Sequence, residues 1–340
     1  MNTGLLNVMT AVAAFVITSL LGLWLIPLLR RLRCCQPISD NAPSWHRKKE
    51  GTPTMGGFLF AAGVTAASLA GWCTYRLSAV PDAAASLSLQ RMDSAKFFLG
   101  LLMALGFGAV GFLDDYLRAV KTHPQGVPDR WKMVLQLLVA CGYLAAVWLS
   151  GDHMTVFYLP FLGRLHLGVF YYPLSALLIV AAVNAVNLTD GLDGLCSSVT
   201  LAAAMGLMLV CRLLGRYSIG MLAAALAGGC LGFLVWNFHP AKVFMGDVGS
   251  LFLGGMLAAV AFGAGVPGML LPVGIVYWAE LLSVLIQRGY YRATGKRLFK
   301  MTPIHHHFEM NGCSEVKITA IFAAVTALGC VLAVLSVRFM

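Results

Sequence analysis

The chain has 340 residues, of which 59% are hydrophobic and only 11% are charged. A soluble domain usually carries about twice that charged fraction, so this composition, with a mean hydropathy of +0.80, excludes an ordinary soluble protein. The formal net charge of +10 is spread over short segments between apolar runs. We interpret these segments as the basic loops of a polytopic membrane protein, and we expect no nucleic acid among the partners.

Ten apolar segments approach or exceed the roughly 20 residues that a membrane-spanning helix needs. In chain order they cover residues 4–29, 55–75, 97–113, 133–150, 169–188, 195–214, 219–236, 250–266, 269–287 and 317–337. They predict an all-α polytopic integral membrane protein in which residues 1–340 form a single transmembrane domain. The first run is longer than a signal-peptide core and lacks a small-residue cleavage site after it, so we expect it to remain as a span.

Three shorter features add detail to this layout. Near residues 151–168 the chain reads MTVFYLPFLGRLHLGVF (154–170), which predicts a β-hairpin with Gly163 at its turn. The basic stretch 288–317 is long enough to hold a short amphipathic helix against the lipid headgroups. The glycines of GFGAVG (106–111) and GGCLG (228–232) favour a close approach between helices.

The distribution of basic residues predicts how the chain is oriented. With the N-terminus outside, the cytoplasmic loops would be residues 30–54, 114–132, 189–194, 237–249 and 288–317. These loops hold 17 of the 24 Lys and Arg residues, as expected for cytoplasmic segments. Ten spans then return the C-terminus to the outside, and all the aspartates and histidines considered next fall on the cytoplasmic face.

Five carboxylates lie beside apolar runs. Asp114 and Asp115 end the third predicted span, Asp190 and Asp193 follow the fifth, and Asp247 precedes the eighth. Ionisable groups at the edge of the hydrocarbon are unfavourable enough that a functional role is their default interpretation. Carboxylates gathered near one membrane face indicate a divalent cation and a phosphate-bearing substrate. Neighbouring helix residues point about 100° apart, so Asp114 and Asp115 need not address one ligand.

The fifth predicted span ends in a polar sequence. Asn184, Asn187 and Asp190 are spaced i, i+3, i+6 and share one face if the helix continues that far. Gly191 and Gly194 then end the helix and let backbone groups approach a ligand. Asparagine offers donors and acceptors that suit a nucleobase or a sugar. The alternative is a polar contact between helices, which explains Asn184 well but two aspartates poorly.

Two further segments carry polar groups of interest. In NFHPAKVFMGD, Phe244 can stack on a planar base beside the carboxylate of Asp247. The triplet His305–His307 is a poor metal site because consecutive side chains diverge. With Lys300 close by, the triplet favours phosphate contacts instead. Glu280 is the lone acid inside a predicted span, and we expect it to pair within the bundle.

Five segments together resemble a known family. They are KKEGTPTMGG (48–57), GFLDDYLRAVK (111–121), NAVNLTDGLDGL (184–195), NFHPAKVFMGDVGS (237–250) and KMTPIHHHFE (300–309). The chain resembles the polyprenyl-phosphate N-acetylhexosamine-1-phosphate transferase superfamily, marked by the DD and NxxDGxDG elements. Within it the chain is most similar to the phospho-N-acetylmuramoyl-pentapeptide transferase family, which PTMGG and PIHHHFE distinguish. The ten-span layout with an outer N-terminus agrees with that resemblance.

The resemblance implies a reaction in the bacterial cytoplasmic (inner) membrane. Phospho-N-acetylmuramoyl-pentapeptide would pass from UDP-N-acetylmuramoyl-pentapeptide to the membrane lipid undecaprenyl phosphate, with Mg²⁺, to give lipid I and UMP. A homodimer is compatible with the resemblance. Asp114, Asp115 and Asp247 would be catalytic, with Asp247 holding Mg²⁺ and the aspartate pair ordering the attacking phosphate. The positions that would bind substrate by resemblance are Lys49, Thr54, Asn187, Asp190, Asp193, Asn237, Phe244, Gln287, His305 and His306. The sequence patterns add Lys121, Lys132, Asn184 and His307.

One departure and two alternatives stay open at this point. The family commonly has Lys three residues after the second Asp of the DD pair, where this chain has Arg118. Arg and Lys hold phosphate differently, so Lys121 and Lys132 are candidates for that task. One alternative function uses UDP-GlcNAc or another UDP-amino sugar, against which PIHHHFE argues. The other is transport, but transport sites usually lie near the bilayer midplane and often accompany repeats.

Overall fold

The computed structural model describes residues 3–32, 49, 51–78, 87–119 and 126–340. The α-helices are α1 (Thr3–Arg31), α2 (Gly57–Ser78), α3 (Leu87–Ala119), α4 (Asp129–Leu149), α5 (Tyr171–Thr189), α6 (Leu195–Leu213), α7 (Tyr217–Asn237), α8 (Gly246–Gly263), α9 (Leu270–Val273), α10 (Ile275–Thr294), α11 (Ile304–Glu309) and α12 (Glu315–Ser336). Two strands, β1 (Val156–Leu159) and β2 (Gly163–His166), and three short 3-10 helices at Gly168–Phe170, Pro267–Met269 and Val337–Phe339 complete the list.

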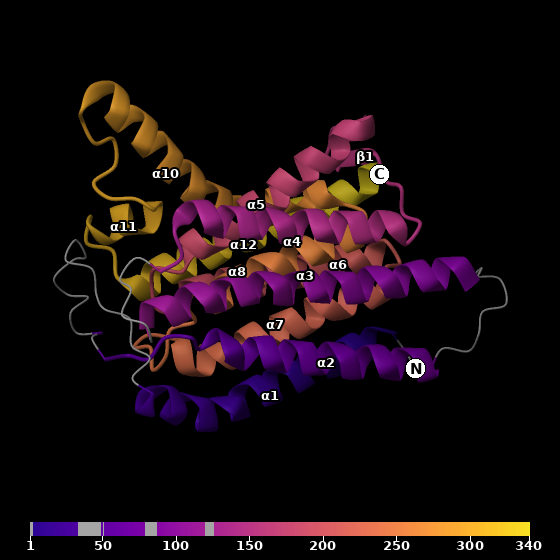
Figure 1. Cartoon of the computed structure of the whole chain (residues 1–340), viewed down its shortest axis with the longest axis horizontal. Coiled ribbons are helices and arrows are strands. Elements are labelled where there is room, and N and C mark those ends of the chain that lie inside the picture. The colour runs from indigo at the N-terminus through magenta and orange to yellow at the C-terminus, as the bar shows by residue number, and fades with distance from the viewer. Residues whose placement is uncertain (1–2, 33–48, 50, 79–86, 120–125) are drawn as a thin grey trace.

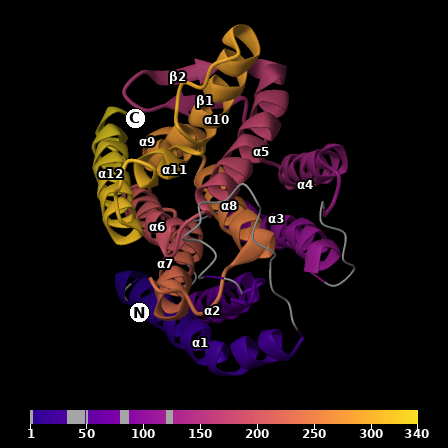
Figure 2. The same ribbon diagram turned by 90° about the vertical axis from the view of Figure 1, so that its left-hand side faces the viewer.

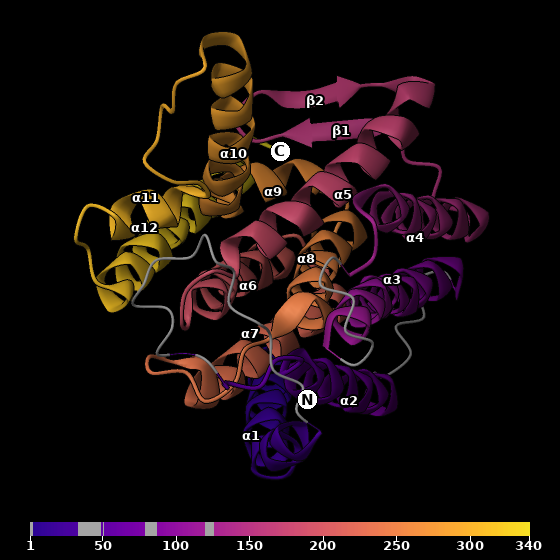
Figure 3. The ribbon, with the colours of Figure 1, turned by 60° about the vertical axis from the view of Figure 1, so that its left-hand side comes forward.

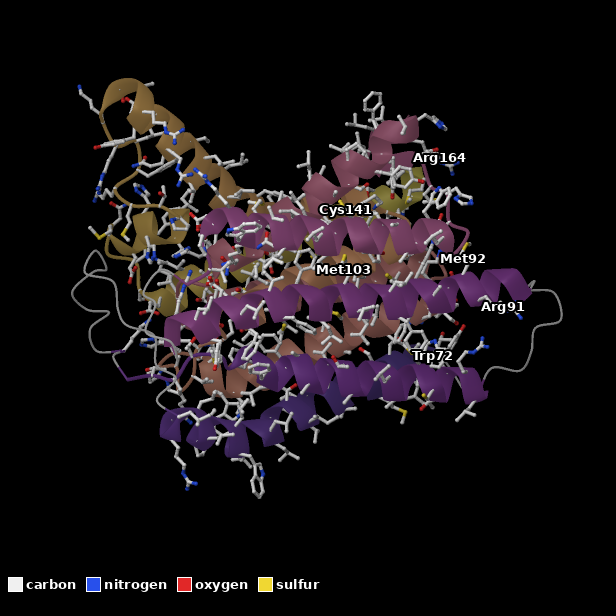
Figure 4. The ribbon with its side chains drawn as sticks, in the orientation of Figure 1. Trp72, Arg91, Met92, Met103, Cys141 and Arg164 are labelled. Atoms are coloured by element: carbon white, nitrogen blue, oxygen red, sulfur yellow. The ribbon has the colours of Figure 1, made fainter. Side chains whose placement is uncertain are left out.

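The long helices form one bundle of membrane-spanning length. Within the described residues, nine helices are long and apolar enough to cross a membrane, and a bent pair makes a tenth. Figure 1 shows them side by side, with both ends of the described chain on the right and α11 on the left. Arg91 and Arg164 lie toward the right-hand end, whereas Met103 and Cys141 lie nearer mid-length (Figure 4). The predicted all-α polytopic membrane architecture is confirmed.

Helices α7 and α8 form the centre of the bundle. They are the most buried of the candidate spans, and Figure 2 shows them surrounded by α1, α2, α3, α5 and α6. Small residues permit this packing, as the sequence predicted. A Cβ on Gly111 of α3 would collide with the carbonyl oxygen of Asp247, and one on Gly228 of α7 with that of Ala11. Helix backbones therefore touch at these points.

The ninth predicted span, 269–287, is not one continuous helix. Residues Pro267–Val273 and Ile275–Thr294 meet at an angle of 81°, and α10 rises away from the bundle near the β-hairpin (Figure 3). Pro272 and Gly274 lie at the bend. Proline lacks an N–H and clashes with the preceding turn, and glycine disfavours a helical backbone. An apolar run that contains Pro272 and Gly274 close together therefore bends at this point.

The two smaller elements follow the sequence. Strands β1 and β2 pair antiparallel, with Val156 opposite His166 and Leu159 opposite Gly163. Gly163 has a φ of +87°, which glycine adopts without strain. The predicted hairpin with its turn at Gly163 is confirmed. In the basic stretch 288–317, the short helix α11 forms and carries the histidine triplet.

Candidate functional site

Asp114 and Asp115 lie in the last turns of α3. This helix continues to Ala119, so the predicted end of the span at residue 113 is too early. Asp114 is completely buried, and its Oδ1 accepts a hydrogen bond from the backbone N–H of Val127 at 2.8 Å. Arg118, one turn further along α3, places Nη2 2.8 Å from Asp114 Oδ2. Arg118 therefore contacts the carboxylate of Asp114, at the position where the family commonly has Lys.

Asp115 faces the start of α8. Its Oδ2 accepts a hydrogen bond from Val248 N–H at 3.0 Å, which satisfies one of the free donors in the first turn of that helix. Gly246, the first residue of α8, has a φ of +70°, and a Cβ there would collide with Asp115 Oδ2 and Thr54 Oγ1. Only glycine fits this position, which lets α8 begin against Asp115 and brings Asp247 beside the aspartate pair.

Asp247 has both oxygens held by neighbouring helices. Asn187 of α5 donates to its Oδ1 at 2.9 Å and also donates to Ser250 Oγ at 2.8 Å. Lys132 of α4 donates to its Oδ2 and lies 3.6 Å from Asp114 Oδ2. The predicted residues Asp114, Asp115, Asp247, Lys132 and Asn187 therefore converge from four helices. We call Asp114, Asp115 and Asp247, with Lys132 and Arg118, the carboxylate cluster.

The carboxylate cluster fits a divalent cation. One oxygen from each of Asp114, Asp115 and Asp247 lies within 4.8 Å of the others. Asp114 Oδ2 is buried, with Arg118 Nη2 at 2.8 Å and Lys132 Nζ at 3.6 Å. Oxygen ligands from carboxylates are those that Mg²⁺ and Ca²⁺ take. The three close carboxylates thus suit a small hard cation.

A second cluster joins four segments of the chain around Asp193. Lys49 Nζ lies 2.8 Å from Asp193 Oδ1 and 2.7 Å from Glu315 Oε2. Asp193 Oδ2 accepts a hydrogen bond from Ala241 N–H at 3.0 Å and lies 3.1 Å from His239 Nδ1. Both oxygens of this buried carboxylate are engaged by the chain itself. We call Lys49, Asp193, His239 and Glu315 the Lys49 cluster.

Lys49 supplies the positive charge of its cluster. Burial lowers the pKa of a lysine, but the hydrogen bonds and negative charges of Asp193 and Glu315 outweigh burial and raise the pKa of Lys49 above its usual value. Ligand atoms of Asp193, His239 and Glu315 are close enough together to hold a metal ion. The Lys49 ammonium already contacts both carboxylates, so it takes the place of a cation there.

The PTMGG segment runs from the Lys49 cluster to the carboxylate cluster. Phe244 N–H donates to Pro53 O and Gly56 N–H donates to Phe244 O, both at 2.8 Å. Thr54 is buried, and its Oγ1 borders Gly246. These backbone bonds fix the residues that precede Asp247, and they leave the ring of Phe244 partly exposed.

Asn237 ends α7 and links two loops. Its Oδ1 accepts hydrogen bonds from Gly194 N–H at 3.2 Å and from Ser197 Oγ at 3.4 Å. Its Nδ2 donates to Val243 O at 2.9 Å. The predicted residue Asn237 therefore joins the loop that carries Asp193 to the segment that carries Phe244.

Asp190 and Asn184 differ from the expected arrangement. Helix α5 ends at Thr189, and Asp190 follows with φ −82° and ψ 66°, so the predicted common face of Asn184, Asn187 and Asp190 ends before Asp190. Burial raises the pKa of Asp190 well above its usual range, and the charges of nearby carboxylates add to the shift. Asn184 donates to Gln136 Oε1 at 2.5 Å, which is a polar contact between α5 and α4.

His305 is directed into the protein. It is completely buried, and its Nδ1 lies 3.0 Å from Oε1 of the equally buried Glu280. A Cβ on Gly191 would collide with His305 Nε2, so the imidazole packs directly on the loop between Asp190 and Asp193. Glu280 therefore pairs inside the protein, as expected, but its partner lies on the short helix α11 and not on a spanning helix.

The remaining predicted residues lie near the end of α10. His306 Nδ1 is 3.0 Å from Glu309 Oε2, and His307 Nδ1 accepts a hydrogen bond from Lys300 N–H at 3.2 Å. The three histidines thus diverge toward different partners, as the sequence predicted. Gln287 Oε1 accepts hydrogen bonds from the backbone N–H groups of residues 298 and 299, at 3.0 Å each, so it fixes the loop after α10. Lys121 lies outside the described residues.

Sequence reasoning missed Glu315, His239 and Gln136. Glu315 begins the last apolar helix, and His239 stands two residues after Asn237. Both are ionisable groups at the edge of an apolar run, the signal that identified the aspartates. Gln136 lies within a predicted span, where a buried amide indicates a partner on another helix.

Similarity to known proteins points to the same family as the sequence motifs. Residues 97–264 match the family model described as Glycosyl transferase family 4. A phospho-N-acetylmuramoyl-pentapeptide-transferase of Acetivibrio thermocellus is 40% identical over 98% of this chain and 96% of its own length. Proteins with the same name from Clostridium perfringens and Heliobacterium modesticaldum are both 42% identical, over 96% and 95% of this chain and 95% and 96% of their own lengths.

The chain belongs to the phospho-N-acetylmuramoyl-pentapeptide-transferase family. The resemblance inferred from the five motifs is confirmed. As a member of this family the protein is a transferase with several membrane spans. The family implies a nucleotide-sugar donor and a polyprenyl phosphate acceptor that resides in the membrane. Both clusters lie at one end of the bundle, beside the ends of α3 and α7 and the starts of α6, α8 and α12.

Proposed function

We propose that the protein transfers phospho-N-acetylmuramoyl-pentapeptide from UDP-N-acetylmuramoyl-pentapeptide to undecaprenyl phosphate in a Mg²⁺-dependent reaction. The products are lipid I and UMP, and the reaction belongs to peptidoglycan synthesis. The observation that carries this proposal is the convergence of Asp114, Asp115 and Asp247 within 4.8 Å. The shared name of the relatives supports the choice of donor.

The transfer exchanges one phosphorus–oxygen bond for another. An oxygen of undecaprenyl phosphate attacks the phosphorus attached to the sugar, and the bond from that phosphorus to UMP breaks, with UMP taking the electron pair. Such a reaction needs positioning and charge neutralisation more than covalent participation by the protein. A general base is not compulsory, because the second ionisation of a phosphate monoester has a pKa near 6.

The carboxylate cluster serves the reacting phosphates. Mg²⁺ held by Asp247, with Asp114 and Asp115 close by, would stabilise the negative charge that develops during transfer. Asn187 fixes the orientation of Asp247 through its 2.9 Å hydrogen bond. Lys132 supplies a positive charge between Asp247 and Asp114, and it can exchange a carboxylate for a substrate phosphate.

The Lys49 cluster serves the nucleotide. Lys49 contributes a cation, and its ammonium has three donors, of which two contact carboxylates. The partly exposed ring of Phe244 offers a face for the uracil base. Asn237 holds the two loops at a fixed separation. We place both clusters on the cytoplasmic face of the bacterial inner membrane, because the basic loops flank them. A homodimer stays a prediction.

A UMP-release assay on the purified protein in detergent tests the proposal. It contains undecaprenyl phosphate and UDP-N-acetylmuramoyl-pentapeptide, with Mg²⁺ or with EDTA. We expect release that requires both the lipid and Mg²⁺ and that Asp247→Ala abolishes. Release with UDP-GlcNAc but not with the pentapeptide nucleotide would refute the proposed donor. Lack of release with either nucleotide would refute the transferase proposal.

A further inference from the structure

The Lys49 cluster contains one acid that the proposed chemistry does not use. Glu315 lies in the first turn of α12, and its Oε2 contacts two segments that are far away in the sequence. It accepts a hydrogen bond from Lys49 Nζ at 2.7 Å and another from the backbone N–H of Asp193 at 3.1 Å. The side chain is only 12% exposed. One carboxylate oxygen of α12 therefore joins a lysine and a loop that are both expected to bind the nucleotide.

The position of Glu315 at a helix start does not explain these contacts. An acid in a first turn is favourable next to the helix dipole, wherever its side chain points. That role needs no partner and leaves the carboxylate in solvent. Glu315 instead turns away from solvent and is shared between two donors. The loop that carries Asp193 makes a second contact with α12, because Thr319 Oγ1 donates to the carbonyl oxygen of Asp193 at 3.5 Å.

The geometry of the cluster gives the second acid a role. Asp193 has both oxygens engaged, by Lys49 on one side and by Ala241 and His239 on the other. Asp193 contacts Lys49 through a single oxygen, Oδ1. With this contact alone, the flexible lysine side chain could change the direction of its ammonium group. Glu315 adds a second anchor on the ammonium and fixes its direction.

We infer that Glu315 is a positioning residue for nucleotide binding, acting through Lys49 and through the backbone of Asp193. This inference rests on the proposed nucleotide substrate. Glu315 holds the ammonium so that its third N–H faces the nucleotide, and it holds the loop that begins α6. It does not touch the reacting phosphates, so its loss weakens binding of the donor and leaves the transfer step intact.

Glu315→Gln in the full-length protein tests the inference. We expect the KM for the nucleotide to rise about tenfold, since a charge-assisted hydrogen bond becomes a neutral one. The kcat and the KM for undecaprenyl phosphate should stay within about twofold, because neither involves the donor site. Asp129→Asn is the matched control: it removes the same charge from the exposed first turn of α4 and should change none of these constants.

A double-mutant cycle identifies the route. If Glu315 acts through Lys49, then Glu315→Gln should add no more than about twofold to the nucleotide KM of Lys49→Met. Glu315→Asp keeps the charge and should recover most of the affinity that Glu315→Gln loses. If Glu315→Gln does not fold, Glu315→Ala takes its place with the same expected rise in KM. An unchanged nucleotide KM in the variant that lacks the charge, or a fall in kcat as large as the rise in KM, would overturn the inference.

The two proposals can fail separately. Turnover by the wild type with an unaffected KM in the variants removes the role of Glu315 and leaves the proposed function standing. If the wild type does not turn over, the proposed function fails, and calorimetric titration with UMP still tests Glu315. Binding about tenfold weaker in Glu315→Gln than in Asp129→Asn would support the positioning role, and equal binding or lack of binding would refute it.

Discussion

The two polar clusters at the same end of the bundle are built in opposite ways. In the carboxylate cluster, oxygens of three acids lie within 4.8 Å of one another, and Arg118 and Lys132 contact Asp114 from the side. In the Lys49 cluster, both oxygens of Asp193 have partners, and Lys49 contacts two acids. The first cluster concentrates three carboxylates, and the second shares one lysine between two carboxylates.

This difference suggests that one cluster takes part in the chemical step and that the other positions the loops around it. Carboxylates this close together disfavour one another's negative charge, so three of them favour the binding of a divalent cation. A fully satisfied network instead rigidifies the segments that it joins. The carboxylate cluster therefore suits a site that takes up metal and phosphate. The Lys49 cluster suits a frame that holds loops in place.

The largest effect should come from the carboxylate cluster. Asp247→Asn keeps the size of the side chain and removes its charge. We expect kcat to fall by about a thousandfold or more, because stabilisation of transition-state charge is lost, while the protein remains folded. UMP release measures the rate and thermal unfolding measures the fold. A kcat within tenfold of the wild type would show that Asp247 is not the principal metal ligand.

The next largest effect should fall on stability. Glu280→Ala leaves the buried ring of His305 without its hydrogen-bond partner, and a buried polar group left unsatisfied usually costs about 1–3 kcal/mol. We expect a clearly lower Tm, with loosening of the loop that packs on His305 at Gly191. Glu280→Gln retains a hydrogen bond and should lose less. An unchanged Tm in Glu280→Ala would show that the pair does not anchor α11.

A smaller and more selective effect should follow from Lys49→Met. We expect the KM for the nucleotide to rise by roughly tenfold to fiftyfold, because a charged contact with the donor is lost and Asp193 and Glu315 are left facing each other. The kcat should change less than the KM. Steady-state kinetics with each substrate varied in turn checks this. A loss confined to kcat would move Lys49 into the chemical step and erase the contrast between the clusters.

The smallest effect should come from Asn184→Leu. Asn184 pairs with Gln136 between α5 and α4, and interhelical polar contacts in membranes contribute on the order of 1 kcal/mol. We expect a slightly lower Tm and a nucleotide KM within about twofold of the wild type. A large rise in that KM would show that Asn184 contacts the substrate, as the sequence pattern also allowed.

Local pattern was enough to predict most of the fold. Apolar length gave the spans, glycine spacing gave the helix contacts at Gly111 and Gly228, and strand pattern gave the hairpin. The bend between α9 and α10 was missed because its residues are as apolar as those of a straight span. The backbone effect of Pro272 and Gly274 depends on how neighbouring helices pack, which hydropathy does not report.

Local sequence pattern also predicted part of the site. The aspartates stood out because each interrupts an apolar run. The partners of those acids could not be read from the chain: Glu315 reaches Lys49 across 266 residues, and Asn187 reaches Asp247 across 60. Such pairings arise from the packing of α5, α8 and α12. Residue type identified the aspartates, and the fold assigned their neighbours, including Glu315, which sequence reasoning missed.

The most direct test of the division between the clusters measures binding and turnover in the same two variants. Calorimetric titration with UMP and UMP-release kinetics would be compared for Asp247→Asn and Lys49→Met. We expect Asp247→Asn to bind UMP within about threefold of the wild type without turnover, and Lys49→Met to bind at least tenfold more weakly while keeping most of its kcat. Loss of UMP binding in Asp247→Asn with intact binding in Lys49→Met would contradict the separation of chemistry from positioning.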